Sequence, residues 1–167
     1  MGLDQYLIGK LFIWSSSGQG GRREITELVG RKHPFVKGLE ASTVVFEGGY
    51  WRKANQIHKW FVDNIQGGED NCENYPVTFE QLKILYDLCI KLMVKKSSAQ
   101  AKKLLPTTSG FFFGGTDYGP DYWNDIQKTI DILAPLFGTV AAVIDEAAGN
   151  KQEDSFKDLE YEYHSSW

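Results

Sequence analysis

The sequence predicts an α+β fold, in which a small antiparallel sheet carries helices packed on one face. Two observations lead to this prediction: segments with strand character stand near both ends of the chain, and amphipathic helical patterns fill most of the region between them. A length of 167 residues is ordinary for one domain, so residues 1–167 are predicted to form a single domain.

Strand character is clearest in three segments. Residues 4–14 alternate imperfectly between the two faces of a strand, which is typical of a strand with a bulge, here near Gly9. Residues 42–46 are β-branched and apolar, and residues 159–164 alternate between apolar or aromatic and polar side chains. The run at 107–115 holds three phenylalanines between glycines, which fits either a buried strand or a tight loop.

Helical periodicity is strongest in the middle of the chain. Apolar residues recur at helical spacing over 51–65, and the glycine pair 67–68 ends that pattern. A second pattern over 79–93 begins at a capping box, in which the Thr78 hydroxyl accepts from the backbone of Gln81 and the Gln81 side chain reaches back. Further helices are expected at 98–105, at 120–137 with Pro135 kinking or ending the helix, and at 139–148.

The segments between these elements are polar or rich in glycine. Residues 15–21 are predicted to be a flexible loop, residues 67–76 a polar loop and residues 149–154 a polar linker. Residues 22–39 carry five Arg or Lys residues and show no clear periodicity, so no element is predicted there.

Composition and charge exclude several functions. The net charge of −4 argues against broad, sequence-independent nucleic-acid binding. Cys72 and Cys89 are too few for a disulfide framework or a four-ligand zinc site. Cys89 falls on an apolar helical face, so we expect a reducing compartment. The chain shows no secretory signal and no apolar run of spanning length, which predicts a cytoplasmic protein that does not bind membranes.

No established catalytic motif is present in the sequence. A P-loop, a zinc-protease H-E-x-x-H and a G-x-S-x-G elbow are all missing. The three histidines, His33, His58 and His164, lack the spacing of metal ligands, and no nucleophile–base pair is evident. We therefore expect no metal and no cofactor, and a binding function is favoured over an enzyme.

The first candidate site lies at the start of the first predicted helix. Trp51, Asn55 and His58 stand at i, i+4 and i+7, so they share one flank of that helix beside its core face. Arg52 and Lys53 fall in its first turn, where cations oppose the helix dipole unless an anion is nearby. The alternative is an ordinary amphipathic helix whose Arg and Lys side chains extend to water.

The second candidate site lies in the phenylalanine-rich segment. Three consecutive phenylalanines in an extended segment cannot all face one core, and the flanking glycines allow a ligand to approach the backbone. The alternative is a strand buried on both faces. The candidate binding residues are Ser109, Phe111, Phe112, Phe113, Thr116, Asp117 and Tyr118.

The third candidate site is the C-terminus, which supplies His164 and Trp167. A terminal tryptophan frays into solvent unless it docks and closes a surface. We expect Trp51, Phe112 and Trp167 to converge on one hollow, with aromatic walls and positive charge at its edge.

Four segments of the chain carry a family resemblance: MGLDQYL at the start, GYWRKANQIHKWF, LLPTTSGFFFGGTDYG and the terminal YHSSW. Together they resemble a family of small uncharacterised phage-encoded proteins. The resemblance covers most of the chain in patches and leaves out residues 15–39 and 137–149. It implies an accessory protein that acts on host machinery in the host bacterial cytoplasm, and it implies no particular chemistry.

Three functions follow from these patterns. The first is capture of a small anionic ligand, such as a nucleotide-derived host defence signal, with aromatic rings stacking on a base and Arg52, Lys53 and His58 meeting phosphate. The second is inhibition of a host defence enzyme or complex by protein binding, with the acidic segments 69–73 and 153–162 facing a basic surface. The third is a nucleotide-processing enzyme that uses His58 or the C-terminal histidine as acid or base. A homo-oligomer is compatible with all three.

Overall fold

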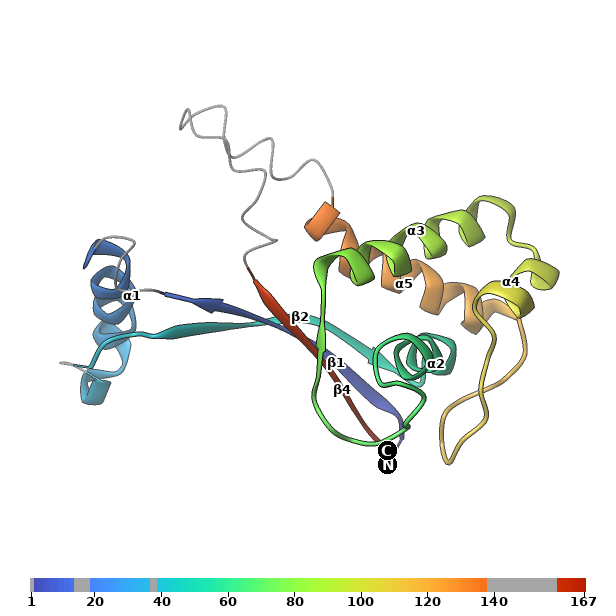
Figure 1. The fold of residues 1–167 in the computed structure, drawn as a ribbon, viewed down its shortest axis with the longest axis horizontal. Coiled ribbons are helices and arrows are strands. Elements are labelled where there is room, and N and C mark those ends of the chain that lie inside the picture. Colours follow the sequence, from blue (N-terminus) through green and yellow to red (C-terminus); the bar gives the residue numbers. More distant parts are fainter. Residues whose placement is uncertain (1, 14–18, 37–38, 138–158) are drawn as a thin grey trace.

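The computed structural model of the chain describes residues 2–13, 19–36, 39–137 and 159–167, and it confirms an α+β fold with an antiparallel sheet (Figure 1). The elements in chain order are β1 (Asp4–Phe12), α1 (Gln19–Lys32), a 3-10 turn η1 (Pro34–Val36), β2 (Thr43–Arg52), α2 (Asn55–Asn64), β3 (Tyr75–Val77), α3 (Phe79–Lys95), α4 (Ser98–Leu104), α5 (Pro120–Phe137) and β4 (Glu160–Ser166). The helix expected at 139–148, the linker expected at 149–154 and residues 15–18 of the expected loop lie outside the described residues.

The sheet has the strand order β2-β1-β4-β3, and each neighbouring pair runs antiparallel. β1 lies between β2 and β4, so the first and last strands pair directly and the two ends of the chain lie side by side (Figure 1). The bulge that the sequence predicts near Gly9 falls between Leu7 and Ile8. Leu7 faces Gly49 and Ile8 faces Glu47, which leaves one extra residue on β2.

Helices α2, α3 and α5 share one core with a single face of the sheet. The strand side chains Leu7, Trp51 and Tyr163 point into this core and are fully buried. α5 packs directly on β2, because a Cβ atom added to Gly49 would lie 2.5 Å from Ile132 Cγ2. The arrangement confirms the prediction that helices pack on one face.

α1 stands apart from the other helices. Pairing between β1 and β4 stops at Lys10, but the β1–β2 ribbon continues and carries α1 at its far end (Figure 1). The segment for which the sequence predicts no element is therefore largely helical. We call the ribbon from the Gly9–Phe46 pair outward, together with α1 and η1, the arm. Its exposed large apolar side chains are Phe12, Leu28, Val29, Phe35, Leu39, Val45 and Phe46.

The helix predicted over 51–65 begins later than expected. β2 continues through Arg52, Lys53 adopts a left-handed backbone with φ of 60°, and α2 starts only at Asn55. Arg52 and Lys53 therefore precede the helix, and the expected conflict between two cations and its dipole does not arise. The prediction was wrong because the aromatic residues that mark the strand also fit the helical period.

Other local predictions have mixed outcomes. The capping box is confirmed: the Gln81 N–H donates to Thr78 Oγ1 at 3.1 Å, and the Thr78 N–H donates to Gln81 Oε1 at 2.8 Å. Cys89 is buried, as its place on an apolar helical face predicts. α5 contains Pro135 and is helical as far as Phe137, after which residues 138–158 are not described. The polar loop predicted at 67–76 ends in the short strand β3, and residues 107–115 form turns rather than a buried strand.

Candidate functional site

The loop between α4 and α5, residues 105–119, is tied to the start of α2 by one side chain. Asn55 Nδ2 donates to the carbonyl oxygens of Phe113 at 3.2 Å and Gly115 at 2.8 Å. Asn55 Oδ1 accepts from the backbone N–H of Thr108 at 3.1 Å. Asn55 is almost fully buried, so these bonds form away from water and hold both sides of the loop.

A second set of contacts braces the base of this loop. The Thr107 N–H donates to the Tyr118 hydroxyl at 3.2 Å, and Thr107 Oγ1 donates to the carbonyl of Thr116 at 2.9 Å. Asp117 Oδ1 accepts from the backbone N–H of Gly119 at 2.9 Å, just before α5 begins. These bonds hold the two sides of the loop together, although the loop forms no β-sheet pairing.

The tip of the braced loop presents aromatic rings to solvent. Phe111 is 72% exposed and Phe112 is 53% exposed, and their ring centroids lie 4.3 Å apart. Phe112 has a φ of 61°, a left-handed conformation that bulky residues rarely adopt. We call Phe111, Phe112 and the half-exposed Trp167 the aromatic patch. Trp167 lies next to the buried Phe113, which follows Phe112 in the sequence: the two rings are edge-on with centroids 6.0 Å apart.

A hollow of about 240 Å³ lies beside the loop, between the end of β2 and the start of α5. Its lining includes two cations, Arg52 and Lys53, and the three carboxylates of Asp117, Asp121 and Asp125. The hollow therefore combines charges of both signs, with the larger number negative.

The inner wall of the hollow holds a partly desolvated carboxylate. Gln56 is buried, and its Nε2 donates to Asp125 Oδ2 at 3.1 Å. Burial raises the pKa of Asp125, and the bond from Gln56 acts in the opposite direction. The Lys128 charge also lowers the pKa of Asp125, but none of the ion pairs found among the described residues includes this carboxylate.

The side chains of the two cations also come close to Gly2, just before β1. If Gly2 carried a Cβ atom, Lys53 Cε would lie 3.4 Å from it and Arg52 Nη2 would lie 3.9 Å from it. Arg52 Nη1 also lies 3.8 Å from Asp4 Oδ1. The same Gly2 position is 3.8 Å from the carbonyl oxygen of Phe112, so both cations flank the aromatic patch.

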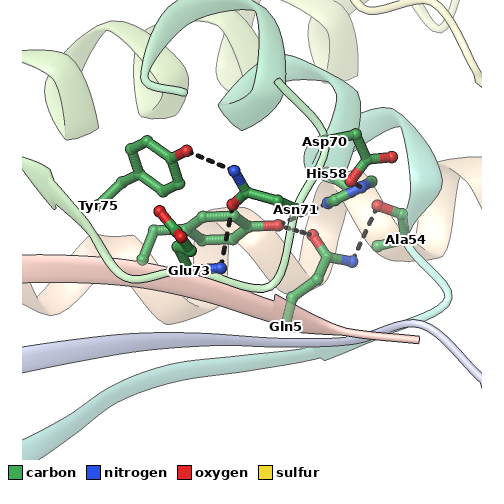
Figure 2. Close-up of polar contacts among 8 residues, drawn as sticks. Gln5, Ala54, His58, Asp70, Asn71, Glu73 and Tyr75 are labelled. Atoms are coloured by element: carbon green, nitrogen blue, oxygen red, sulfur yellow. Dashed lines mark hydrogen bonds and ion pairs between the residues drawn. The ribbon is translucent and has the colours of Figure 1, made fainter. Parts of the chain in front are cut away.

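His58 belongs to a buried polar chain under the same loop (Figure 2). Its Nδ1 lies 2.9 Å from the Tyr163 hydroxyl, and its Nε2 lies 2.9 Å from Asp70 Oδ1. Tyr163 in turn donates to Gln5 Oε1 at 3.1 Å, and Gln5 Nε2 donates to the carbonyl of Ala54 at 3.1 Å. The His58 ring is fully buried and touches Phe113 edge-on at 5.2 Å and Trp167 at 5.8 Å.

The structure separates the residues that the sequence placed on one hollow. Trp51 is a core residue: it is fully buried, and its indole Nε1 donates to Thr129 Oγ1 at 2.9 Å. Phe112 and Trp167 lie on the surface, and neither lines the hollow. His164 points to the opposite face of the sheet, where it stacks on Tyr6 at 4.7 Å. The expected convergence of three aromatic segments on one cavity is therefore wrong.

The remaining candidates keep a place near the loop. Ser109 and Thr116 are exposed on it, Asp117 lines the hollow, and Tyr118 braces its base. Asn55 and His58 hold structure from within rather than facing solvent. Arg52 and Lys53 lie where the loop, the hollow and the N-terminal end of β1 meet.

Sequence reasoning missed five polar residues that the fold brings to this region: Gln5, Gln56, Asp70, Asp121 and Asp125. For Asp121 and Asp125 a signal existed, since they stand at i and i+4 of a predicted helix and share one face. The sequence also carries a signal for Gln5, because this residue lies between Leu3 and Leu7 on the apolar side of its strand.

No protein-family model, no curated protein and no solved structure matches this chain. In the described ranges, no three His, Cys, Asp or Glu side chains are arranged to hold a metal ion. None of the described helices combines the length and the apolar character needed to cross a membrane.

Proposed function

We propose that this protein acts by binding another protein through the aromatic patch. The observation that carries the proposal is the presentation of Phe111 and Phe112 to solvent at the tip of a loop that Asn55 holds in place. Large aromatic side chains dominate the energetics of protein interfaces, and monomeric proteins rarely leave neighbouring ones exposed without a use.

The bracing of the loop supports this proposal. A contact loop that is already ordered loses little conformational entropy on binding, so more of the contact energy appears as affinity. The left-handed backbone of Phe112 costs free energy that the surrounding bonds must supply. Strain of this kind is concentrated at functional sites, where it orients a side chain that binding requires.

The charge beside the aromatic patch suggests the chemistry of the partner. Arg52 and Lys53 lie next to the three carboxylates of the hollow, so a partner surface with charges of both signs would be complementary to this end of the molecule. The resemblance to phage-encoded proteins makes a host protein the expected partner, and inhibition of a host defence enzyme or complex the expected effect.

The experiment compares capture of host proteins by variants that keep the fold. Phe111→Ser removes one exposed ring, and Phe112→Asn removes the other with a residue that tolerates the left-handed backbone. The double variant is expected to lose a partner that the original chain retains, with an affinity for the purified partner weaker by about tenfold or more. Val94→Ser, an equally exposed apolar residue on α3, is the matched control and should bind normally. Equal capture by all three proteins would refute the proposal.

A second candidate function is the capture of a small anionic ligand, such as a nucleotide-derived defence signal. Arg52 and Lys53 at the hollow favour it, whereas the three carboxylates oppose it. Isothermal titration with a panel of cyclic and ADP-ribose-type nucleotides tests it. Binding at micromolar concentrations that is lost in the Arg52→Gln, Lys53→Gln double variant is expected under this function, and the absence of heat would end it.

A further inference from the structure

The buried series of hydrogen bonds from Gln5 through Tyr163 and His58 to Asp70 has a definite donor-to-acceptor direction. Gln5, Tyr163 and His58 are fully buried, whereas Asp70 is 39% exposed at the surface. One end of the chain is fixed by a backbone carbonyl, that of Ala54, which accepts hydrogen bonds and never donates one. The group that faces it must therefore be the amide nitrogen of Gln5.

This orientation of Gln5 determines the next two bonds. With its nitrogen on Ala54, Gln5 presents Oε1 to Tyr163, so the Tyr163 hydroxyl uses its only proton in donating to Gln5 at 3.1 Å. The Tyr163 oxygen can then only accept from His58, which requires a proton on Nδ1 of that ring. Burial raises the pKa of Tyr163 well above its ordinary value, so it remains a hydroxyl throughout.

The last bond then needs one further proton. His58 Nε2 and Asp70 Oδ1 lie 2.9 Å apart, and with Nδ1 already protonated a hydrogen between them makes either an imidazolium with a carboxylate or a neutral ring with a carboxylic acid. In both forms the pair holds one proton more than a neutral ring with a carboxylate. We infer that Gln5 is a positioning residue that biases the His58–Asp70 pair toward holding this extra proton, by setting the direction of the Tyr163 hydroxyl.

When the His58–Asp70 pair loses its extra proton, the hydrogen bond between His58 and Tyr163 changes direction. A neutral His58 would donate from Nε2 to Asp70, and Nδ1 would become an acceptor toward which the Tyr163 hydroxyl turns. Gln5 Oε1 would then face the Tyr163 oxygen without a donor in a fully buried site, which is unfavourable. The Tyr163 hydroxyl thus has two positions, and Gln5 stabilises the one that accompanies the protonated pair.

The groups that face His58 act in opposite directions. Burial of the ring lowers the pKa of His58, and the Asp70 carboxylate raises it. Among the described residues, the titratable groups bonded to the ring are Asp70 from the loop after α2 and Tyr163 from β4. The other contacts are uncharged: the amide of Gln5 acts through Tyr163, and the Phe113 and Trp167 rings pack on the imidazole. Gln5 therefore adds its effect to that of Asp70.

NMR titration of the His58 imidazole tests this inference. In Gln5→Met, the Tyr163 hydroxyl is free to donate to Nδ1, so the His58 pKa should fall by about one unit relative to the original chain, the equivalent of one hydrogen bond. The same substitution in a Tyr163→Phe background should leave the pKa unchanged, because the connecting hydroxyl is gone. A pKa that does not fall in Gln5→Met, or that falls equally in both backgrounds, overturns the inference.

A measurement on the original chain keeps the inference testable if Gln5→Met fails to fold. Above the pKa of the pair, the single proton of His58 should reside on Nε2, toward Asp70, and below it both ring nitrogens should be protonated. The nitrogen chemical shifts distinguish these forms. A neutral ring with its proton on Nδ1 would contradict the proposed reversal. The inference does not depend on the proposed binding surface.

Discussion

The side-chain amide of Asn55 donates to the carbonyl oxygen of Gly115 at 2.8 Å, across a separation of 60 positions in the sequence. The first residue of α2 thus holds the far side of the loop that presents the aromatic patch. An asparagine suits this place because its amide is both donor and acceptor, and the loop offers two carbonyls and one N–H to it.

The first prediction concerns this anchor. Asn55→Asp has nearly the same shape, but it replaces the donor that faces Phe113 and Gly115 with an acceptor. We expect the unfolding free energy to fall by about 2–4 kcal/mol, because buried carbonyl groups lose their partner and meet a like dipole. Urea denaturation measures this change. Asn64→Asp is the control, since the Asn64 amide donates to the carbonyl of Trp60 within its own helix turn. Equal stability of the two variants would contradict the anchoring role.

The second prediction concerns the dependence of stability on pH. Burial lowers the pKa of His58 below its ordinary 6.5, so the unfolded chain takes up this proton before the folded protein does. Stability should therefore be full above pH 6.5 and decline as the pH falls from that value toward the lower folded-state pKa. Urea unfolding between roughly pH 7.5 and 5.5 measures the decline.

The control for the pH prediction is His58→Gln, which cannot titrate. This variant should be less stable than the original chain at pH 7 because it disturbs a buried polar chain, yet its stability should change less over the same pH range. A variant that declines as steeply as the original chain would assign the pH dependence to other groups.

The third prediction concerns the contact between β2 and α5. A methyl group at Gly49 would meet Ile132 Cγ2 at 2.5 Å, so Gly49→Ala should cost about 1–3 kcal/mol of unfolding free energy. In an Ile132→Ala background the nearest remaining atom is Trp51 Cη2 at 3.3 Å, so the same substitution should cost less. Denaturation of the four proteins in this cycle measures the coupling. Additive costs would show that the helix can shift without penalty.

The fourth prediction concerns the arm. β2 is an edge strand on which Val45 and Phe46 are exposed. Phe46 lies beside Pro135 and Leu136 of α5, and Val45 is one residue further toward the tip of the arm. Long apolar edges without prolines pair readily with other strands, so we expect copies of this chain to associate through the arm. Sedimentation velocity should show mass rising with concentration, and Val45→Lys should suppress it. Val94→Lys, on α3, is the matched control. A monomer at all concentrations would contradict the prediction.

Much of the fold is predictable from the sequence because local signals and tertiary structure agree. The capping box at Thr78 and the alternation around Tyr161 and Tyr163 each mark an element that forms as expected. β3 was missed because it has three residues, one of them Pro76, and its pairing with β4 is its main support.

The candidate site is less predictable because its residues meet through long-range packing. Trp51 has the spacing of a helical flank residue, but its partner Thr129 lies 78 positions away, and that contact is what defines it as core. The left-handed backbone at Lys53, which separates β2 from α2, was not predicted because no glycine stands at that position. Local patterns drew attention to the phenylalanine segment, but Phe113 is the ring that packs against His58 and Trp167, and those contacts cannot be seen in the local sequence.

The pairing of β1 with β4 has a practical consequence for handling this protein. Asp4 and Ser166 are partners across the strands, and the residues beyond them lie next to the aromatic patch: Gly2 beside the carbonyl of Phe112, and Trp167 beside Phe113. An affinity tag or fluorescent fusion at either terminus would therefore sit over the proposed contact surface. Labels for interaction assays are better attached to an exposed position on α3, such as Val94, where they would leave that surface open.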